Sequence, residues 1–275
     1  MENILIVGLG LIGASYAKGL TKKGYKVYGC DLDEETNSFA VSSGFVCAAS
    51  ENPCDYIEQV DTIIIGLYPK DIVPFLLKYQ KYFNENQVIT DVCGVKSSVC
   101  AAATQAALPA KFVGSHPMAG REKIGIKFAD EKIFTGTNFL ICPLKETDEM
   151  AIKVVEEIAS ALEFGYIHHI TPEHHDHMIA YTSQLTHAIA VCLVNSESSV
   201  DVSKFIGDSY RDLTRIAMIN EKLWSELFFD NKDALIQEIE SFEKEIEKLK
   251  TALLSQKKDE LKDLFVASRK KREVM

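Results

Sequence analysis

Residues 4–13 read ILIVGLGLIG, an apolar run that passes into a glycine-rich turn, and the next residues, ASYAKGL, have the pattern of a helix. A strand, G-x-G-x-x-G and a helix in this order are typical of a dinucleotide-binding βαβ unit. Gly8 permits the tight turn, Gly10 lets the backbone approach a pyrophosphate, and Gly13 lets the helix pack closely on the strand. The N-terminus of the helix then offers free N–H groups to the phosphates.

The residues after the second predicted strand indicate which dinucleotide is bound. That strand, KVYGC, ends at Asp31, about where the fingerprint expects an acid that accepts both hydroxyls of the adenine ribose. The sequence continues Leu-Asp-Glu-Glu, so a 2′-phosphate would meet only negative charge. We therefore predict NAD rather than NADP. The predicted cofactor-binding residues are Gly8, Gly10, Leu11, Ile12, Gly13, Asp31, Leu67, Tyr68 and Val92.

Apolar runs alternate with helical patterns as far as residue 170. The runs are ILIV, KVYGC, DTIIIGL, QVITDV, KFVGSH, NFLICP and YIHHI. This alternation is typical of βαβ units around a mostly parallel sheet. Thr171 and Pro172 then have the pattern of a helix cap and first turn, and the rest of the chain has helical patterns. We predict an α/β fold: a Rossmann-type, doubly wound parallel sheet at 1–170, followed by an all-α domain at 171–275.

Composition limits the classes of partner. A formal net charge of -10 argues against a nucleic-acid or anionic-membrane surface, which leaves a small molecule as the expected partner. The N-terminus lacks a signal-peptide pattern, and no apolar run is long enough to span a bilayer, so we expect a cytoplasmic protein. The seven cysteines are scattered, which favours reduced thiols over disulfides or a zinc site.

The turn GSHPMAG at 114–120 places His116 at the end of a predicted strand, the edge where open α/β sheets bind ligands. An imidazole titrates near pH ~6.5, so at neutral pH it can accept a proton from a substrate hydroxyl as hydride leaves the carbon. The alternative is a buried histidine that only packs. Pro117 and Gly120 follow His116 on a loop at the edge of the sheet rather than on an apolar face, and this favours the chemical role.

Five segments, in order behind the glycine-rich turn, carry a resemblance to a known family: DVCGVKSS, GSHPMAGREKIG, YTSQLTHAIA, YRDLTRIA and LWSELF. Together they resemble the prephenate dehydrogenase family of tyrosine biosynthesis. The resemblance implies an NAD-dependent oxidative decarboxylation of prephenate to 4-hydroxyphenylpyruvate, with His116 as the base. It also implies that Arg215 binds a substrate carboxylate, that Ser183 and His187 line the nicotinamide and substrate pocket, and that Trp224 closes the site.

These roles also make chemical sense. Prephenate carries two carboxylates and a ring carbinol, so its oxidation needs a hydride acceptor, a base and a cation whose geometry fits a carboxylate twice. NAD, His116 and Arg215 would supply these without a metal. Ser183 and His187 are four residues apart on a predicted helix and would share a face. The alternatives are a hydrogen-bonded interface histidine for His187, and ordinary core packing for Trp224.

Two positions depart from the family pattern. Gly94 stands where many relatives have a serine that hydrogen-bonds the catalytic histidine, so Ser97 or a water would have to orient His116. Arg121 stands where relatives often have a small hydroxyl residue. It would either add a cation to the mouth of the pocket or lie on the surface.

Two further features have an open interpretation. His168, His169, His174, His175 and His177 lack metal-ligand spacing, so we expect a solvated or hinge-packed cluster and no metal. Apolar residues recur at spacings of three and four from Ile236 to Leu253, which suits packing within the chain or against a second subunit in a homodimer.

Other functions are compatible with part of the pattern. Arogenate dehydrogenase performs the same reaction on the amino form of the side chain. A β-hydroxyacid or imine dehydrogenase joins the same two kinds of domain, but would place a lysine or aspartate where this chain has Ser183 and His187. A catalytically silent NAD-binding sensor would account for Gly94 but not for His116 and Arg215.

Overall fold

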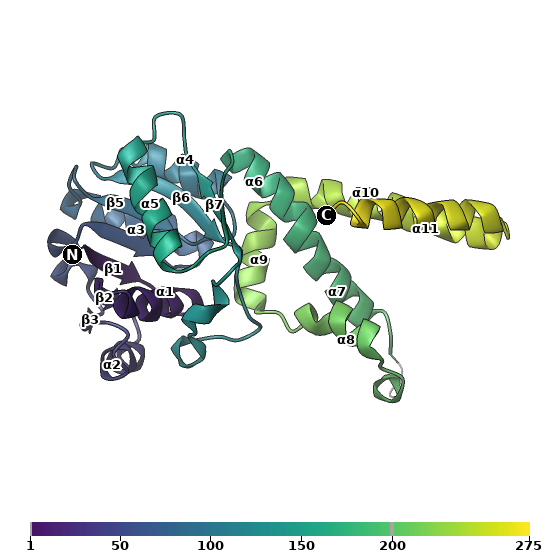
Figure 1. Ribbon diagram of the computed structural model, residues 1–275, viewed down its shortest axis with the longest axis horizontal. Coiled ribbons are helices and arrows are strands. Elements are labelled where there is room, and N and C mark those ends of the chain that lie inside the picture. The colour runs from purple at the N-terminus through teal and green to yellow at the C-terminus, as the bar shows by residue number, and fades with distance from the viewer. Residues whose placement is uncertain (1, 199–200) are drawn as a thin grey trace.

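The computed structural model describes residues 2–198 and 201–275 and contains one eight-stranded sheet with a helical domain beside it (Figure 1). The strand order is β3-β2-β1-β4-β5-β6-β7-β8, which confirms the doubly wound fold predicted from the alternating pattern. The strands are β1 (Asn3–Val7), β2 (Lys26–Cys30), β3 (Ala48–Ser50), β4 (Thr62–Ile65), β5 (Val88–Asp91), β6 (Lys111–Pro117), β7 (Asn138–Cys142) and β8 (Tyr166–His169).

Five helices cover the two faces of the sheet: α1 (Leu11–Lys22), α2 (Glu34–Ser42), α3 (Pro69–Tyr79), α4 (Ser97–Gln105) and α5 (Glu149–Ala161). Side chains alternate between the faces along each strand. In β1, Ile4 and Ile6 pack with α1 and α5, whereas Leu5 and Val7 pack with α3 and α4. Because both faces are covered, β1 and β4 contain continuous apolar runs, Ile4–Val7 and Ile63–Ile65, rather than alternately polar residues.

Three strands differ from the predicted pattern. The three-residue edge strand β3 pairs with β2 and was not predicted, because Ala-Ala-Ser has no apolar run that signals a strand. β7 runs antiparallel to β6, and β8 then pairs parallel with β7. The sheet is therefore mostly parallel, as predicted, but its last two strands, β7 and β8, run opposite to the other six.

The helical part begins with α6 (Pro172–Ile179), whose N-cap Thr171 accepts a hydrogen bond from the His174 amide. A π-helical turn at Ala180–Gln184 joins α6 to α7 (Leu185–Asn195). The remaining helices are α8 (Asp208–Thr214), α9 (Glu221–Asp230), α10 (Lys232–Leu254) and α11 (Lys258–Arg272). The α-helical second domain is thus present as predicted.

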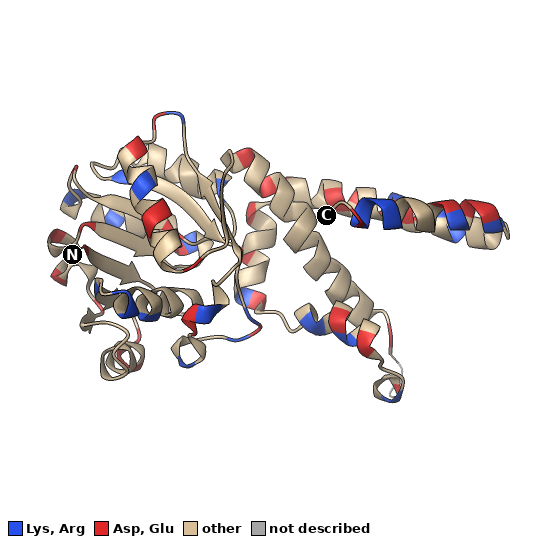
Figure 2. Cartoon of the chain, viewed as in Figure 1, with Lys and Arg blue, Asp and Glu red and all other residues tan. Residues whose placement is uncertain are grey.

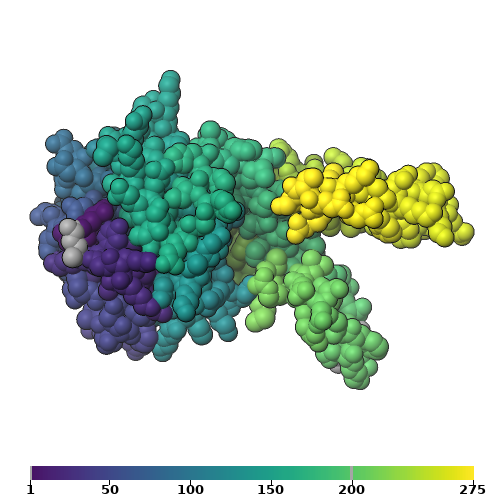
Figure 3. Space-filling view, in the orientation of Figure 1, coloured from purple at the N-terminus to yellow at the C-terminus, as the bar shows by residue number. Residues whose placement is uncertain are grey.

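The last two helices form an antiparallel arm that projects from the rest of the molecule (Figure 3). Charges of both signs are interspersed along this arm, whereas α7 carries none (Figure 2). The apolar stripe on α10 is largely uncovered: Ile246 is 50% exposed and Leu253 is 55% exposed. Packing within the chain therefore does not account for the stripe.

Among residues 2–198 and 201–275, no helix combines the length and apolar character needed to cross a membrane.

Candidate active site

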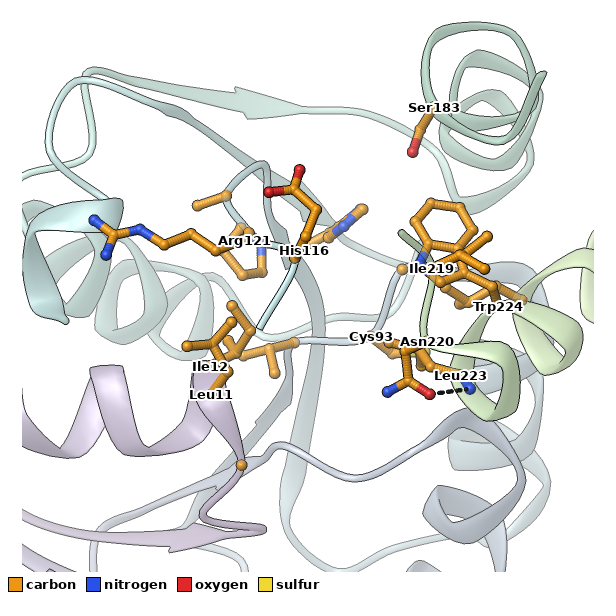
Figure 4. Close-up of a pocket in the computed structure, with 18 of the residues that line it drawn as sticks. Leu11, Ile12, Cys93, His116, Arg121, Ser183, Ile219, Asn220, Leu223 and Trp224 are labelled. Atoms are coloured by element: carbon orange, nitrogen blue, oxygen red, sulfur yellow. Dashed lines mark hydrogen bonds between the residues drawn. The ribbon is translucent and has the colours of Figure 1, made fainter. Parts of the chain in front are cut away.

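A cleft of about 610 Å³ opens where the carboxyl ends of the parallel strands face the helical domain. Figure 4 shows its walls: Leu11 and Ile12 of the glycine-rich turn lie on one side, Leu223 and Trp224 of α9 on the other, and His116 between them. This is the crevice where open α/β sheets bind ligands. The sheet and the helical domain each contribute a wall.

The glycine-rich turn has the geometry that a pyrophosphate needs. A side chain at Gly8 or Gly13 would clash with backbone, at 2.5 Å from the Gly66 carbonyl oxygen and 2.0 Å from the Gly8 carbonyl oxygen respectively. By contrast, the space beside Gly10 is open. No side chain caps the N-terminus of α1 and no acidic residue lies in its first turn. The amide groups and positive end of α1 are therefore available to an anion.

Asp31 follows β2 and is held by backbone amides. Its carboxylate accepts hydrogen bonds from the Leu9 amide at 2.8 Å and the Asp33 amide at 3.0 Å. Each carboxylate oxygen has two acceptor sites, so the group can still accept ribose hydroxyls. Neither Asp31 nor Gly8 is among the residues that line the cleft. Asp31 contacts the glycine-rich turn through the Leu9 amide. These residues fit a dinucleotide.

The other predicted cofactor residues, Leu67, Tyr68 and Val92, follow β4 and β5 and line the same cleft. The Tyr68 hydroxyl accepts a hydrogen bond from the Asn220 side-chain amide at 3.0 Å. Asn220 also caps α9 by accepting from the Leu223 amide. This contact joins the cofactor side of the cleft to the helical domain, and no pattern in the sequence predicted it.

His116 is held by a chain of two further residues. Its Nδ1 lies 2.9 Å from Nε2 of His175, and Nδ1 of His175 lies 2.7 Å from Oδ1 of Asp176. Asp176 also accepts the amides of Lys96 and Ser97, each at 2.8 Å, at the start of α4. His175 is fully buried, whereas the His116 ring lines the cleft.

Burial lowers the pKa of His116 well below its usual value, and the neighbouring His175 and the Lys96 cation lower it further. Lys96 is itself buried and paired with Asp91; although burial opposes the charge, the Asp91 carboxylate raises the pKa of Lys96. The imidazole of His116 is therefore neutral at physiological pH. A neutral imidazole is the form that can act as a base.

The structure answers the question posed by Gly94. A Cβ at this position would lie 3.9 Å from Cε1 of His116 and 3.2 Å from a methyl carbon of Leu227, so α9 occupies the space beside it. The direct partner of His116 is His175, not Ser97, which contacts Asp176 instead. Of the five clustered histidines, His175 is the packed one, and it also hydrogen-bonds His116, a contact that the sequence analysis did not predict.

Ser183, His187 and Trp224 all line the helical wall. Ser183 lies in the π-helical turn, a feature that occurs frequently at functional sites. The Nδ1–H of His187 donates to the Ser183 carbonyl at 2.9 Å, which leaves Nε2 free, and the His187 ring stacks on Trp224 with centroids 3.6 Å apart. Burial lowers the pKa of His187, so this ring is also neutral at physiological pH.

The two arginines at the cleft lie in different settings. Arg215 forms an ion pair with Glu122, which lines the cleft, but the Arg215 side chain is 63% exposed and lies outside the lining. Arg121 does line the cleft, is paired with Asp130 at 2.8 Å, and extends away from Trp224 (Figure 4). Within the described part of the chain, Glu122 is the only acidic residue that lines the cleft.

His175, Asp176, Glu122 and Asn220 are the functional candidates that the sequence analysis missed. A signal for the first two was present. Spacings of three and four put Pro172, His175, Asp176 and Ile179 on one face of the predicted helix, and the structure shows that this face is buried. A His-Asp pair on the buried face of a helix implies hydrogen-bond partners, because buried polar groups are rarely left unpaired.

Among the described residues, no group of three or more His, Cys, Asp or Glu side chains could hold a metal ion.

A sheet with a dinucleotide-binding turn, joined across a cleft to a helical domain, defines a two-domain nucleotide-dependent protein. Residues 16–164 match the family model described as the prephenate dehydrogenase nucleotide-binding domain, and residues 171–267 match the prephenate dehydrogenase dimerization domain. The chain belongs to the prephenate dehydrogenase family, as the sequence motifs predicted.

Individual relatives agree with the family match. The chain is 28% identical to the prephenate dehydrogenase of Bacillus subtilis over 260 residues, 91% of this chain and 70% of the relative. It is similar to the structure of prephenate dehydrogenase from Aquifex aeolicus in complex with hydroxyphenyl propionate and NAD+, with 29% identity, a TM-score of 0.91, and 99% and 98% of the two chains covered. The chain is also similar to the structure of Synechocystis arogenate dehydrogenase, with 26% identity and a TM-score of 0.83. That match covers 98% of this chain and 99% of the other.

Proposed function

We propose that this protein oxidises and decarboxylates prephenate, with NAD as hydride acceptor, to give 4-hydroxyphenylpyruvate. The observation that carries the proposal is the position of His116. Its neutral ring lies in the cleft between the dinucleotide-binding turn and the helical wall. A base in that position can reach a substrate hydroxyl while the same carbon faces the cofactor.

The predicted cofactor, NAD, is confirmed by the match to the family's nucleotide-binding domain and by the NAD+ complex of the similar Aquifex aeolicus structure. When bound, NAD supplies the acceptor for the hydride of the ring carbinol. The free amides at the start of α1 would bind its pyrophosphate, and Asp31 would accept the adenine-ribose hydroxyls.

Nε2 of His116 accepts the proton of the substrate's ring hydroxyl. His175 contacts Nδ1 of His116 and leaves Nε2 available. Loss of the carbinol hydrogen as hydride then leaves a ring carbonyl, and departure of the carboxylate as CO₂ makes the ring aromatic. The protein has to orient the substrate and remove one proton, and it needs no covalent nucleophile.

Arg215 binds a substrate carboxylate in this scheme. Its guanidinium already holds a carboxylate, that of Glu122 at the edge of the cleft. An exposed ion pair of this kind contributes only about 0–1 kcal/mol, so a substrate carboxylate can replace Glu122 at little cost. Ser183 and His187 face the same space and would contact the polar groups of the side chain, while Trp224 covers it. Arg121 adds a cation to the mouth of the cleft.

Arogenate is the second candidate substrate, because Glu122 lines the cleft. Once Arg215 is bound to the substrate, this carboxylate is available to an ammonium group. Prephenate has a ketone at that position and gains nothing from Glu122. The β-hydroxyacid dehydrogenase alternative is less well supported, because α6, the π-helical turn and α7 contain no lysine, and their one aspartate, Asp176, does not line the cleft.

The exposed stripe on α10 supports a homodimer. Its residues Ile246 and Leu253 are half exposed, and the segment lies within the match to the family's dimerization domain. A second copy of the chain would cover this apolar surface. The proposed enzyme has two domains: residues 1–170 bind the cofactor, and residues 171–275 bind the substrate and form the dimer. We propose that it acts in the cytoplasm.

The test is NADH formation by the purified protein with prephenate or arogenate, each with NAD or NADP, together with identification of the product by mass spectrometry. We expect turnover of prephenate with NAD and release of 4-hydroxyphenylpyruvate. Turnover of arogenate alone would change the substrate but keep the mechanism. No turnover in any combination would contradict the proposal and favour a silent NAD-binding sensor.

A further inference from the structure

The buried face of α6 carries a hydrogen-bonded pair that the proposed reaction has not yet used. His175 is fully buried and Asp176 is 6% exposed. They link the cleft to the N-terminus of α4, 80 residues away in the sequence at Lys96. Polar groups buried to this degree are costly unless they are fully paired, so their arrangement is specific.

The hydrogen-bond directions in this chain follow from Asp176. Its carboxylate accepts the Lys96 and Ser97 amides, and although burial opposes the charge, these bonds and the one from His175 lower the pKa of Asp176. An ionised carboxylate only accepts, so Nδ1 of His175 carries a proton and donates to it. A neutral His175 then has a lone pair on Nε2. The partner of that lone pair, Nδ1 of His116, must carry a proton.

We infer that His175, oriented by Asp176, is a positioning residue for the reaction proposed above, and keeps the proton of the neutral His116 ring on Nδ1. This tautomer leaves the lone pair on Nε2, the only ring nitrogen of His116 without a hydrogen bond among the described residues. In the opposite tautomer Nε2 would carry the proton and the ring could not act as a base there. The inference depends on the proposed function.

The same contact assists the base when it becomes charged. After His116 takes the substrate proton it is an imidazolium, and its Nδ1–H donates to the His175 lone pair, which Asp176 polarises. The other charged groups near the ring are Lys96, which opposes the cation, and Asp91, which is paired with Lys96. Asp176 is therefore the carboxylate that acts on His116 through a hydrogen-bonded route. Gly94 has no side chain that could do so.

The first measurement is the tautomer of His116 in the intact protein, from ¹⁵N NMR of histidine-labelled samples at pH 7, assigned by comparison with His116→Asn. We expect the proton on Nδ1. A proton on Nε2 would overturn the inference. This readout needs no substrate, so it remains informative if the protein turns over neither prephenate nor arogenate.

The second measurement compares two variants of His175. Leucine cannot accept the Nδ1–H of His116, whereas glutamine offers a carbonyl to accept it and an amide to donate to Asp176. We expect His175→Leu to move the His116 proton to Nε2 and to lower kcat by about 10- to 100-fold, the effect typical of losing the partner of a functional histidine at metal sites. His175→Gln should keep the wild-type tautomer and recover most of kcat.

The matched control is His174→Gln, which changes an exposed histidine of the same helix and should leave tautomer and kcat unchanged. The affinity for NAD and the KM for prephenate should stay near wild type in all three variants. Equal losses in His175→Leu and His175→Gln, or full activity in His175→Leu, would contradict a positioning role. If the wild-type protein is inactive, the proposed function fails, whatever the NMR result.

Discussion

His116 and Arg215 have the two main roles in the proposed reaction, and the structure holds them in opposite ways. His116 belongs to a strand, lines the inner part of the cleft and has a partner that is buried and paired in turn. Arg215 is 63% exposed, and its only described partner is the Glu122 carboxylate. The base is fixed before substrate arrives, whereas the cation can exchange one carboxylate for another. Preorganisation matters most where a proton moves, because the reacting atoms must already be aligned.

The sharpest way to break this comparison is to remove the base. His116→Asn keeps a polar side chain but cannot take up the substrate proton. We expect kcat to fall by about 10²- to 10⁴-fold, the usual contribution of a general base, with NAD affinity unchanged. Steady-state kinetics and calorimetric titration with NAD measure the two quantities. Normal turnover would remove His116 from the mechanism.

Removal of the cation should act on binding instead. In Arg215→Gln the substrate loses a charged hydrogen-bond partner worth about 1.5–3 kcal/mol. We therefore expect KM for prephenate to rise by roughly 10- to 100-fold, with a smaller change in kcat. Arg211→Gln is the matched control, because the partners of Arg211, Asp208 and Ile206, do not line the cleft, whereas the partner of Arg215, Glu122, does. An unchanged KM in Arg215→Gln would contradict the carboxylate role.

Buried neutral histidines on one side of the cleft should also make stability sensitive to acid. Burial lowers the pKa of His116 and His175 below the unfolded value of about 6.5, so below that pH the unfolded state binds more protons. The free energy of unfolding should then fall as pH drops, by up to about 1.4 kcal/mol per pH unit for each histidine that stays neutral. Urea unfolding at pH 7.5 and pH 5.5 measures this. We expect a smaller acid effect in His116→Asn; an equal one would assign the effect to other groups.

The smallest expected effect concerns Glu122 and distinguishes the two candidate substrates. Glu122→Gln removes the negative charge that would meet the ammonium of arogenate. We expect kcat/KM for arogenate to fall by up to about fivefold relative to that for prephenate, the scale of an exposed ion pair. Parallel assays with both substrates give the ratio directly. A preserved ratio would mean that Glu122 does not contact the side chain of the substrate.

The features that could be predicted from the sequence are local ones, which depend on residues close together in the chain. The turn at Gly8, Gly10 and Gly13 is local, because its geometry depends on residues within one βαβ unit. The helix start at Thr171 and Pro172 is local as well, and it was predicted correctly. Local patterns of this kind predicted the fold class and the cofactor. The apolar strand before His116 predicted its place at a strand end.

Contacts between distant segments could not be predicted in this way. His116 and His175 are 59 residues apart, and Arg215 and Glu122 are 93 apart. Their meeting depends on how α6 and the segment after α8 dock against the sheet, which periodicity does not specify. The short edge strand β3 was missed for a different reason, since a three-residue strand carries little pattern.

The most direct test of a neutral, prepositioned base is the pH dependence of kcat/KM for the wild-type protein with prephenate and NAD, with His187→Asn as a control. We expect a plateau from about pH 6.5 to 8 and a decline only at lower pH, because burial lowers the pKa of His116. His187 is the second neutral histidine in the cleft and could cause a similar decline. If His116 is the base, the decline should persist in His187→Asn. An acidic limb centred above pH 7, or one that disappears in His187→Asn, would contradict the assignment of His116 as the base.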